Sequence, residues 1–70
     1  MGKLPVITAK EFYNLLIKHG CTPISSTGSH FKIEYNGKRT TIPIHGNKDI
    51  SRDFMKAILL QLNINQDDFK

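Results

Sequence analysis

Hydrophobic residues near the start of the chain recur every three or four positions, which is the spacing of one helix face. The recurring positions are Phe12, Leu15 and Leu16, followed by His19. Thr8 and Glu11 are spaced as a capping box just before this stripe, and Gly20 offers a left-handed stop after it. The pattern predicts a helix of about three turns between Thr8 and Gly20.

The middle of the chain alternates between apolar and polar residues on both sides of Asn36-Gly37, the preferred dipeptide of a two-residue type I′ turn. Before the turn, the core side is assigned to Phe31, Ile33 and Tyr35, and the outer side to His30, Lys32 and Glu34. After it, the core side is assigned to Thr40, Ile42 and Ile44, and the outer side to Thr41, Pro43 and His45. This alternation predicts a β-hairpin with one buried face.

A two-residue turn also fixes which residues face each other across the hairpin. The predicted pairs are Tyr35 with Lys38, Glu34 with Arg39, Lys32 with Thr41, and His30 with Pro43. His45 is then the diagonal neighbour of His30 on the outer side, roughly 7–8 Å away. A bulge in the hairpin would remove that relation.

The remaining elements flank the hairpin. Residues 21–26 predict a short or edge strand, because Pro23 cannot donate a backbone hydrogen bond. Ser51 is placed as the N-cap of a second helix, which Asn63 can end in a left-handed conformation. The predicted buried stripe of that helix is Phe54, Met55, Ile58, Leu59 and Leu62, and Ile64 and Phe69 are expected to tie a final turn to the core.

The predicted fold is therefore α+β, in the order helix, three strands, helix. Both helices are expected to cover one face of a three-stranded antiparallel sheet, and the other face is expected to be open to solvent. A chain of 70 residues makes one domain, spanning 1–70, with a thin core and no room for a deep enclosed cavity.

The balance of charged residues limits the classes of binding partner. Ten Lys and Arg against six Asp and Glu give a net charge of +4, which favours a polyanion such as nucleic acid, or an acidic protein. Cys21 is the single cysteine, so no internal disulfide can form, and a half-buried thiol in a reducing compartment is expected. No segment has the length of a signal peptide or of a membrane span, so a soluble cytoplasmic protein without a membrane partner is expected.

Gly28-Ser29-His30 is the segment best suited to chemistry. Glycine permits a tight turn before the strand, and the Ser29 hydroxyl can donate to a phosphate oxygen. His30 can take up or release a proton near neutral pH, as phosphoryl chemistry requires, and it shares the outer face with Lys32. The alternative is an ordinary surface histidine.

Cationic side chains could add a path for phosphates. The candidates are Lys32, Arg39 and Lys48, with Lys38 at the hairpin tip as a weaker one. A few phosphate contacts would make binding strongly dependent on salt. The alternatives are a solvated surface, with Arg39 merely paired to Glu34. His45 could contact RNA or assist His30, or it could satisfy backbone groups of its loop.

Other site chemistries are not indicated. No Cys, His, Asp and Glu residues have the spacing of a metal site, and neither a glycine-rich phosphate loop nor a serine-hydrolase pattern occurs. An enzyme with this sequence is expected to work without metal or small-molecule cofactor.

Several of these segments together resemble the HicA toxins of bacterial type II toxin–antitoxin systems. They are Gly28-Ser29-His30, Asn36-Gly37-Lys38-Arg39, Ile42-Pro43-Ile44-His45 and Ile58-Leu59-Leu60-Gln61-Leu62, with residues 9–20 extending the likeness. The resemblance implies a fold like the double-stranded-RNA-binding domain. It also implies a ribonuclease that cleaves mRNA and arrests growth, with His30 as the catalytic histidine and a HicB antitoxin as its partner.

Three functions remain open from the residues. The first is a metal-independent endoribonuclease in which His30 is base or acid, and Ser29 and Lys32 steady the phosphate. The second is a non-catalytic RNA-binding domain. The third is a protein-interaction module whose basic face binds an acidic partner.

Overall fold

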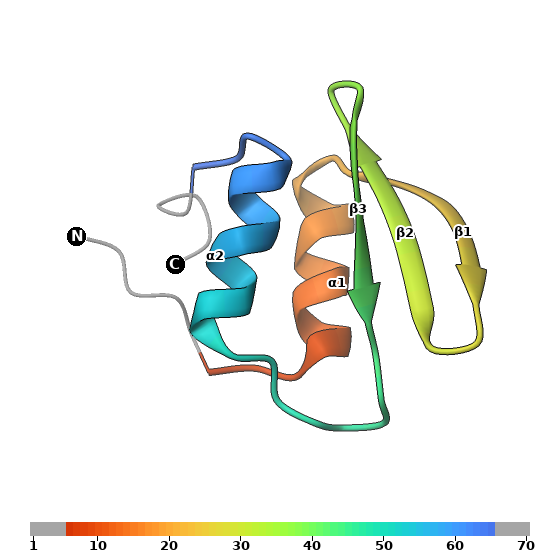
Figure 1. Cartoon of the computed structure of the whole chain (residues 1–70), viewed down its shortest axis with the longest axis vertical. Coiled ribbons are helices and arrows are strands. Elements are labelled where there is room, and N and C mark those ends of the chain that lie inside the picture. The colour runs from red at the N-terminus through yellow and green to blue at the C-terminus, as the bar shows by residue number, and fades with distance from the viewer. Residues whose placement is uncertain (1–5, 66–70) are drawn as a thin grey trace.

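A computed structural model describes residues 6–65 of the chain. Its elements in chain order are α1 (Ala9–His19), β1 (Thr22–Thr27), β2 (His30–Tyr35), β3 (Lys38–Pro43) and α2 (Arg52–Gln61). The strands form one antiparallel sheet in the order β1-β2-β3. Both helices lie on one side of it and contact β3; in Figure 1 α1 is seen next to β3, with α2 beyond α1. The predicted order and layering are confirmed.

The hairpin has the predicted register. His30 pairs with Pro43 at one end and Tyr35 with Lys38 at the other, with no shift between them. The turn explains this regularity, because Asn36 and Gly37 both have positive φ, 51° and 80°, as a type I′ turn requires. β1 is an edge strand with every residue exposed, and its register with β2 shifts between Pro23 and Ser25. A proline tolerated at an irregular edge agrees with the prediction.

Helix α1 begins and ends as its sequence predicts. The Glu11 N–H donates to Thr8 Oγ1 at 3.1 Å, and the Thr8 N–H donates to Glu11 Oε1 at 3.0 Å. This reciprocal pair satisfies two backbone donors that a helix start leaves open. At the other end Gly20 has φ 125°, and its N–H donates to the Ile17 carbonyl at 3.1 Å.

Helix α2 begins at the predicted cap, where the Phe54 N–H donates to Ser51 Oγ at 3.2 Å. Asn63 just after the helix has φ 58°, the predicted left-handed stop. The predicted burial of Phe54 is wrong, because this residue is 38% exposed. The next residue of the same turn, Met55, is fully buried, so this turn of α2 packs against the core through Met55 and leaves Phe54 at its edge. Phe69 lies outside the described residues.

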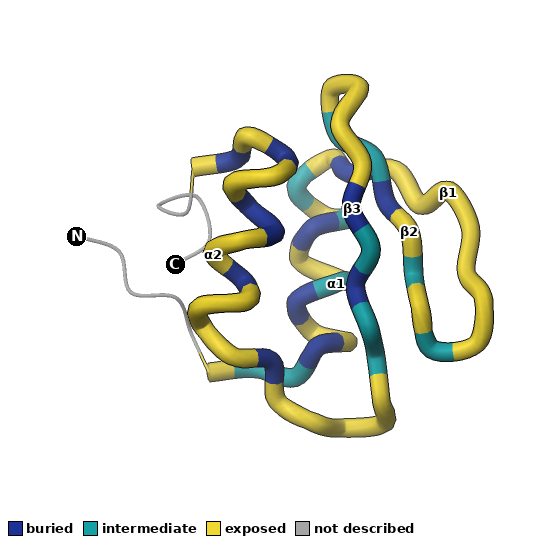
Figure 2. Tube along the Cα trace, viewed as in Figure 1, coloured by how far each residue is buried: buried dark blue, intermediate teal, exposed yellow. Residues whose placement is uncertain are grey.

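The core lies between the helices and the inner face of the sheet (Figure 2). Its fully buried side chains are Phe12, Leu16, Ile33, Ile42, Met55, Ile58, Leu59 and Leu62. Thr40 is buried with them, and its hydroxyl donates to Gln61 Oε1 at 2.6 Å. That bond satisfies a buried polar group and joins β3 to α2. No helix in residues 6–65 has the length and apolar character of a membrane span.

Cys21 is more buried than predicted. Its side chain is 4% exposed, because it directly follows α1 and its N–H donates to the Leu16 carbonyl at 3.0 Å. The half-buried assignment is therefore wrong. Burial disfavours the thiolate and raises the pKa of the Cys21 thiol above its ordinary value of 9.0.

This thiol gives an expected pH dependence of stability. A pKa that is higher in the folded than in the unfolded state means that the stabilisation is complete below the unfolded pKa. It is lost as the pH rises through the folded pKa. Above about pH 9 the free energy of unfolding should fall more steeply for the wild type than for Cys21→Ala. Urea denaturation at a series of pH values measures both slopes, and equal slopes would contradict the expectation.

Candidate active site

The Gly28-Ser29 turn sets the position of His30. Gly28 has φ 59°, and an added Cβ there would meet nothing within 4 Å, so backbone conformation rather than space favours glycine. The Ser29 carbonyl accepts the Ile44 N–H at 2.7 Å, which holds the turn against the end of β3. His30 follows as the first residue of β2, paired with Thr27 and Pro43, and its side chain is exposed. The candidate histidine is thus accessible and lies on an ordered strand end.

Gly28 and Ser29 border a hollow of about 440 Å³ on the side of the sheet that carries α1. Lys10, Tyr13 and Asn14 of α1 line it as well, together with Phe31, Ile44, Gly46 and Asn47. The rings of Tyr13 and Phe31 lie 5.3 Å apart between their centroids. Ser29 therefore shares a surface with α1, an arrangement that the hairpin pattern alone does not indicate.

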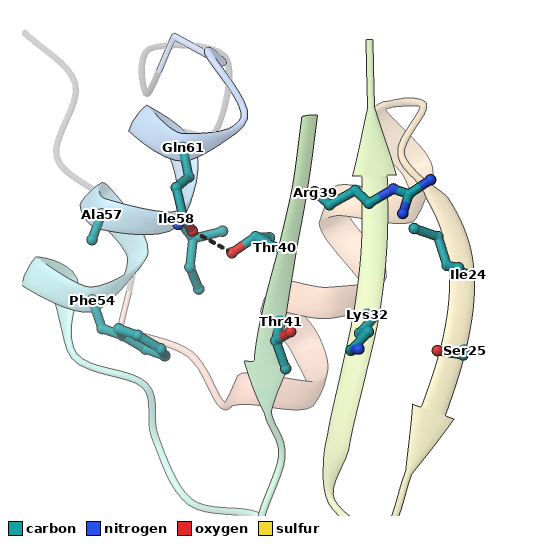
Figure 3. A pocket seen from close by; sticks show the side chains of 10 residues that line it. All are labelled: Ile24, Ser25, Lys32, Arg39, Thr40, Thr41, Phe54, Ala57, Ile58 and Gln61. Atoms are coloured by element: carbon teal, nitrogen blue, oxygen red, sulfur yellow. Dashed lines mark hydrogen bonds between the residues drawn. The ribbon is translucent and has the colours of Figure 1, made fainter. Parts of the chain in front are cut away.

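Lys32 and Arg39 lie on the open face of the sheet and line a second, larger hollow of about 830 Å³ (Figure 3). Arg39 also approaches Glu34 across the hairpin, with 3.8 Å between Nε and Oε2. The Arg39 side chain is 72% exposed, so this pair contributes little to stability. Both cationic side chains are accessible to a phosphate.

His45 and Lys48 lie in the loop that follows β3. The strand ends at Pro43, so the ladder of β2 and β3 does not reach His45, and its diagonal relation to His30 stays a prediction. The Lys48 N–H donates to the His45 carbonyl at 3.3 Å, and the Lys48 carbonyl accepts the Ala9 N–H at 3.1 Å. Both side chains are exposed. Backbone contacts thus fasten this loop to α1.

The predicted site residues fall into three groups. Gly28 and Ser29 lie at the hollow beside α1, Lys32 and Arg39 on the open face, and His45 and Lys48 in the loop. His30 lies on the same strand face as Lys32, two residues away, and lines neither hollow. An exposed histidine with a lysine on the same strand face can transfer a proton next to a bound phosphate.

The structure also adds residues that the sequence did not indicate. Lys10 and Asn14 line the same hollow as Ser29, and Ile24 and Phe54 line the same hollow as Lys32 and Arg39. Their places follow from packing between elements distant in sequence. Helical spacing places Phe54 in the buried stripe, so the sequence carried no signal for its exposure. In residues 6–65 no three or more His, Cys, Asp or Glu residues are grouped so that they could hold a metal ion.

The fold defines the class of domain to which this site belongs. The order α-β-β-β-α, with both helices on one face of an antiparallel sheet, is that of the double-stranded-RNA-binding domain. In agreement, the chain is similar to a chain in the crystal structure of the E. coli HicAB toxin–antitoxin complex. The two share 30% identity with a TM-score of 0.71, over 80% of this chain and 96% of the other.

Sequence comparison defines the family. The family model for the HicA toxin of bacterial toxin–antitoxin systems matches residues 9–64. A probable mRNA interferase HicA of Pseudomonas fluorescens (strain Pf0-1) is 39% identical over 77% of this chain and 90% of its own length. The probable mRNA interferase HicA 1 of Photorhabdus laumondii subsp. laumondii is 37% identical over 77% and 93%. The chain belongs to the HicA toxin family.

Proposed function

We propose that this protein is the toxin of a HicA–HicB type system and acts as a metal-independent endoribonuclease on mRNA. The observation that carries the proposal is the position of His30, exposed at the start of β2 on the face that bears Lys32 and Arg39. Relatives of 37–39% identity bear the name mRNA interferase, which supports the assignment. An imidazole can act as acid or base in proton transfer without a metal.

In the proposed reaction the 2′-oxygen of a ribose attacks the adjacent phosphorus, and the bond from phosphorus to the 5′-oxygen breaks. His30 either removes the proton of the 2′-hydroxyl as base or donates a proton to the leaving 5′-oxygen as acid, and water serves the other end. Lys32 and the Ser29 hydroxyl steady the phosphate charge. The products are a 2′,3′-cyclic phosphate and a 5′-hydroxyl.

The second part of the proposal is a protein partner. The E. coli relative was crystallised in a HicAB complex, which supports a HicB-like antitoxin as the partner of this chain. The proposed substrate and partner both belong in the cytoplasm, which we propose as the location. A reducing compartment also agrees with the buried, unpaired Cys21.

A single assay of the wild-type chain tests this function. Purified protein is incubated with a long RNA in EDTA, and both retention and fragments are scored. We expect fragments with 2′,3′-cyclic phosphate ends, produced at neutral pH without added metal. Salt-sensitive retention without fragments at any pH or metal condition would instead indicate a non-catalytic RNA-binding domain. No measurable RNA affinity even at low salt would indicate a protein-interaction module.

A further inference from the structure

The larger hollow has features that the proposed acid–base chemistry does not use. Outward-facing side chains of the sheet form most of its floor, with the buried Thr40 at the junction with α2, and the flank of α2 beside β3 forms its wall (Figure 3). Its volume of about 830 Å³ falls in the range of ligand sites in proteins. The hollow is therefore large enough to receive part of a substrate.

The wall is one stripe of α2. Phe54, Ala57 and Gln61 are spaced by three and four residues, so they lie along the same side of the helix. The Thr40–Gln61 hydrogen bond of 2.6 Å fastens this side of the helix to β3. The ring of Phe54 extends from α2 toward Thr41, and the small side chain of Ala57 leaves space beside it (Figure 3). An exposed aromatic face thus borders an ordered recess.

The floor is cationic. Lys32 and Arg39 are the charged residues that line the hollow, and no Asp or Glu is among its lining residues. The open pair of Arg39 with Glu34, 3.8 Å apart, can exchange for a phosphate at little cost. The chain as a whole carries +4. The cations can bind phosphates, and the Phe54 ring can stack on a base. The hollow therefore suits a nucleic acid better than an acidic peptide.

We propose that this hollow is a subsite for an unpaired nucleotide of the RNA substrate. The base stacks on the Phe54 ring, and Lys32 and Arg39 hold the flanking phosphates. A ring in the wall can stack only on a base that is free of its duplex partner, so the subsite selects single-stranded segments. The inference rests on the proposed ribonuclease function, since it places the strand along the β2 face that begins with His30.

The test uses binding rather than cleavage. In a His30→Ala background, the affinity for a short unpaired oligoribonucleotide is measured by fluorescence anisotropy as a function of salt. Phe54→Ala should weaken binding by about 5- to 150-fold, the effect of losing one base stack, and Phe54→Tyr should retain the affinity. Lys32→Met should reduce the salt slope by about 0.7, the value of one phosphate contact with a single strand.

Leu60→Ala is the matched control. Leu60 is another exposed apolar residue of α2, at 79% exposure, and it lies outside the hollow, so its removal should leave RNA affinity unchanged. Circular dichroism and thermal melting check that each variant folds. A duplex of the same sequence should bind Phe54→Ala as well as it binds the parent.

The outcomes separate this inference from the proposed function. If the wild type cleaves RNA but Phe54→Ala binds the unpaired strand as tightly as its parent, the subsite is wrong and the ribonuclease stands. If the wild type does not cleave but Phe54→Ala still weakens binding, the subsite stands without the enzyme. Loss of binding to a HicB-like antitoxin alone, with RNA affinity unchanged, would overturn the subsite in favour of a protein-docking surface.

Discussion

Replacement of His30 by alanine is expected to abolish RNA cleavage while the fold remains intact. One positioned acid–base group accelerates such a reaction by about 10²- to 10⁴-fold, and this chain places one candidate of that kind at the start of β2. The His30 side chain is exposed and contributes little to the core, so its removal should not unfold the domain. Cleavage rates of wild type and variant, measured on the same RNA in EDTA, give the size of the loss.

Two further variants define what the loss means. His30→Asn keeps a polar side chain of similar size without a titrating group, so it should bind RNA but fail to cleave it. His19→Gln changes another histidine, near the end of α1, where its ring lies 5.5 Å from that of Tyr35, and should leave the cleavage rate unchanged. Full cleavage by a folded His30→Ala protein would show that another residue performs the chemistry.

The position of His30 was predictable from sequence because its causes are local. Asn36-Gly37 adopts positive φ at both residues, and this turn fixes the register of the hairpin. The register in turn pairs His30 with Pro43 and sets Lys32 on the same outer face. No long-range packing enters that argument, so the sequence was sufficient for it.

The burial of Phe54 and Cys21 was not predictable in the same way. Helical spacing assigns both Phe54 and Met55 to an apolar flank, but only the position of α2 beside β3 decides which one reaches the core. Met55 is fully buried, and Phe54 remains 38% exposed. The Cys21 N–H donates to the Leu16 carbonyl, and this hydrogen bond at the end of α1 holds Cys21 against the helix. Tertiary packing decides the exposure of Phe54, and the helix-closing hydrogen bond positions Cys21.

The two hollows could not be predicted from the sequence either, because residues distant in the chain line each of them. Lys10 of α1 and Ser29 of the turn are far apart in the chain, and they meet only because α1 packs behind the sheet. Phe54 and Lys32 line one hollow for a similar reason, because α2 packs beside β3. For His45 the sequence argument assumed too long a strand. Its predicted place as diagonal neighbour of His30 required β3 to reach residue 45, but the strand ends at Pro43.

Replacement of Phe12 by alanine is expected to destabilise the domain by about 3–5 kcal/mol, the usual cost of removing a buried aromatic side chain. Phe12 is 1% exposed and lies at the centre of the α1 packing surface. A domain of 70 residues has a total stability of roughly 3.5–10 kcal/mol, so this single change can remove most of it. Urea denaturation followed by circular dichroism measures the change.

Leu15→Ala is the matched control for Phe12→Ala, because it removes another apolar side chain from α1. Leu15 keeps 38% of its surface in water in the folded state and is smaller than phenylalanine, so its loss should cost clearly less. Equal losses for the two variants would mean that α1 packs at a different rotation from the one described. A large loss for Phe12 alone would confirm that α1 packs through Phe12 and not through Leu15. The thin core of this 70-residue domain then lies beneath the strands that carry His30 and Lys32.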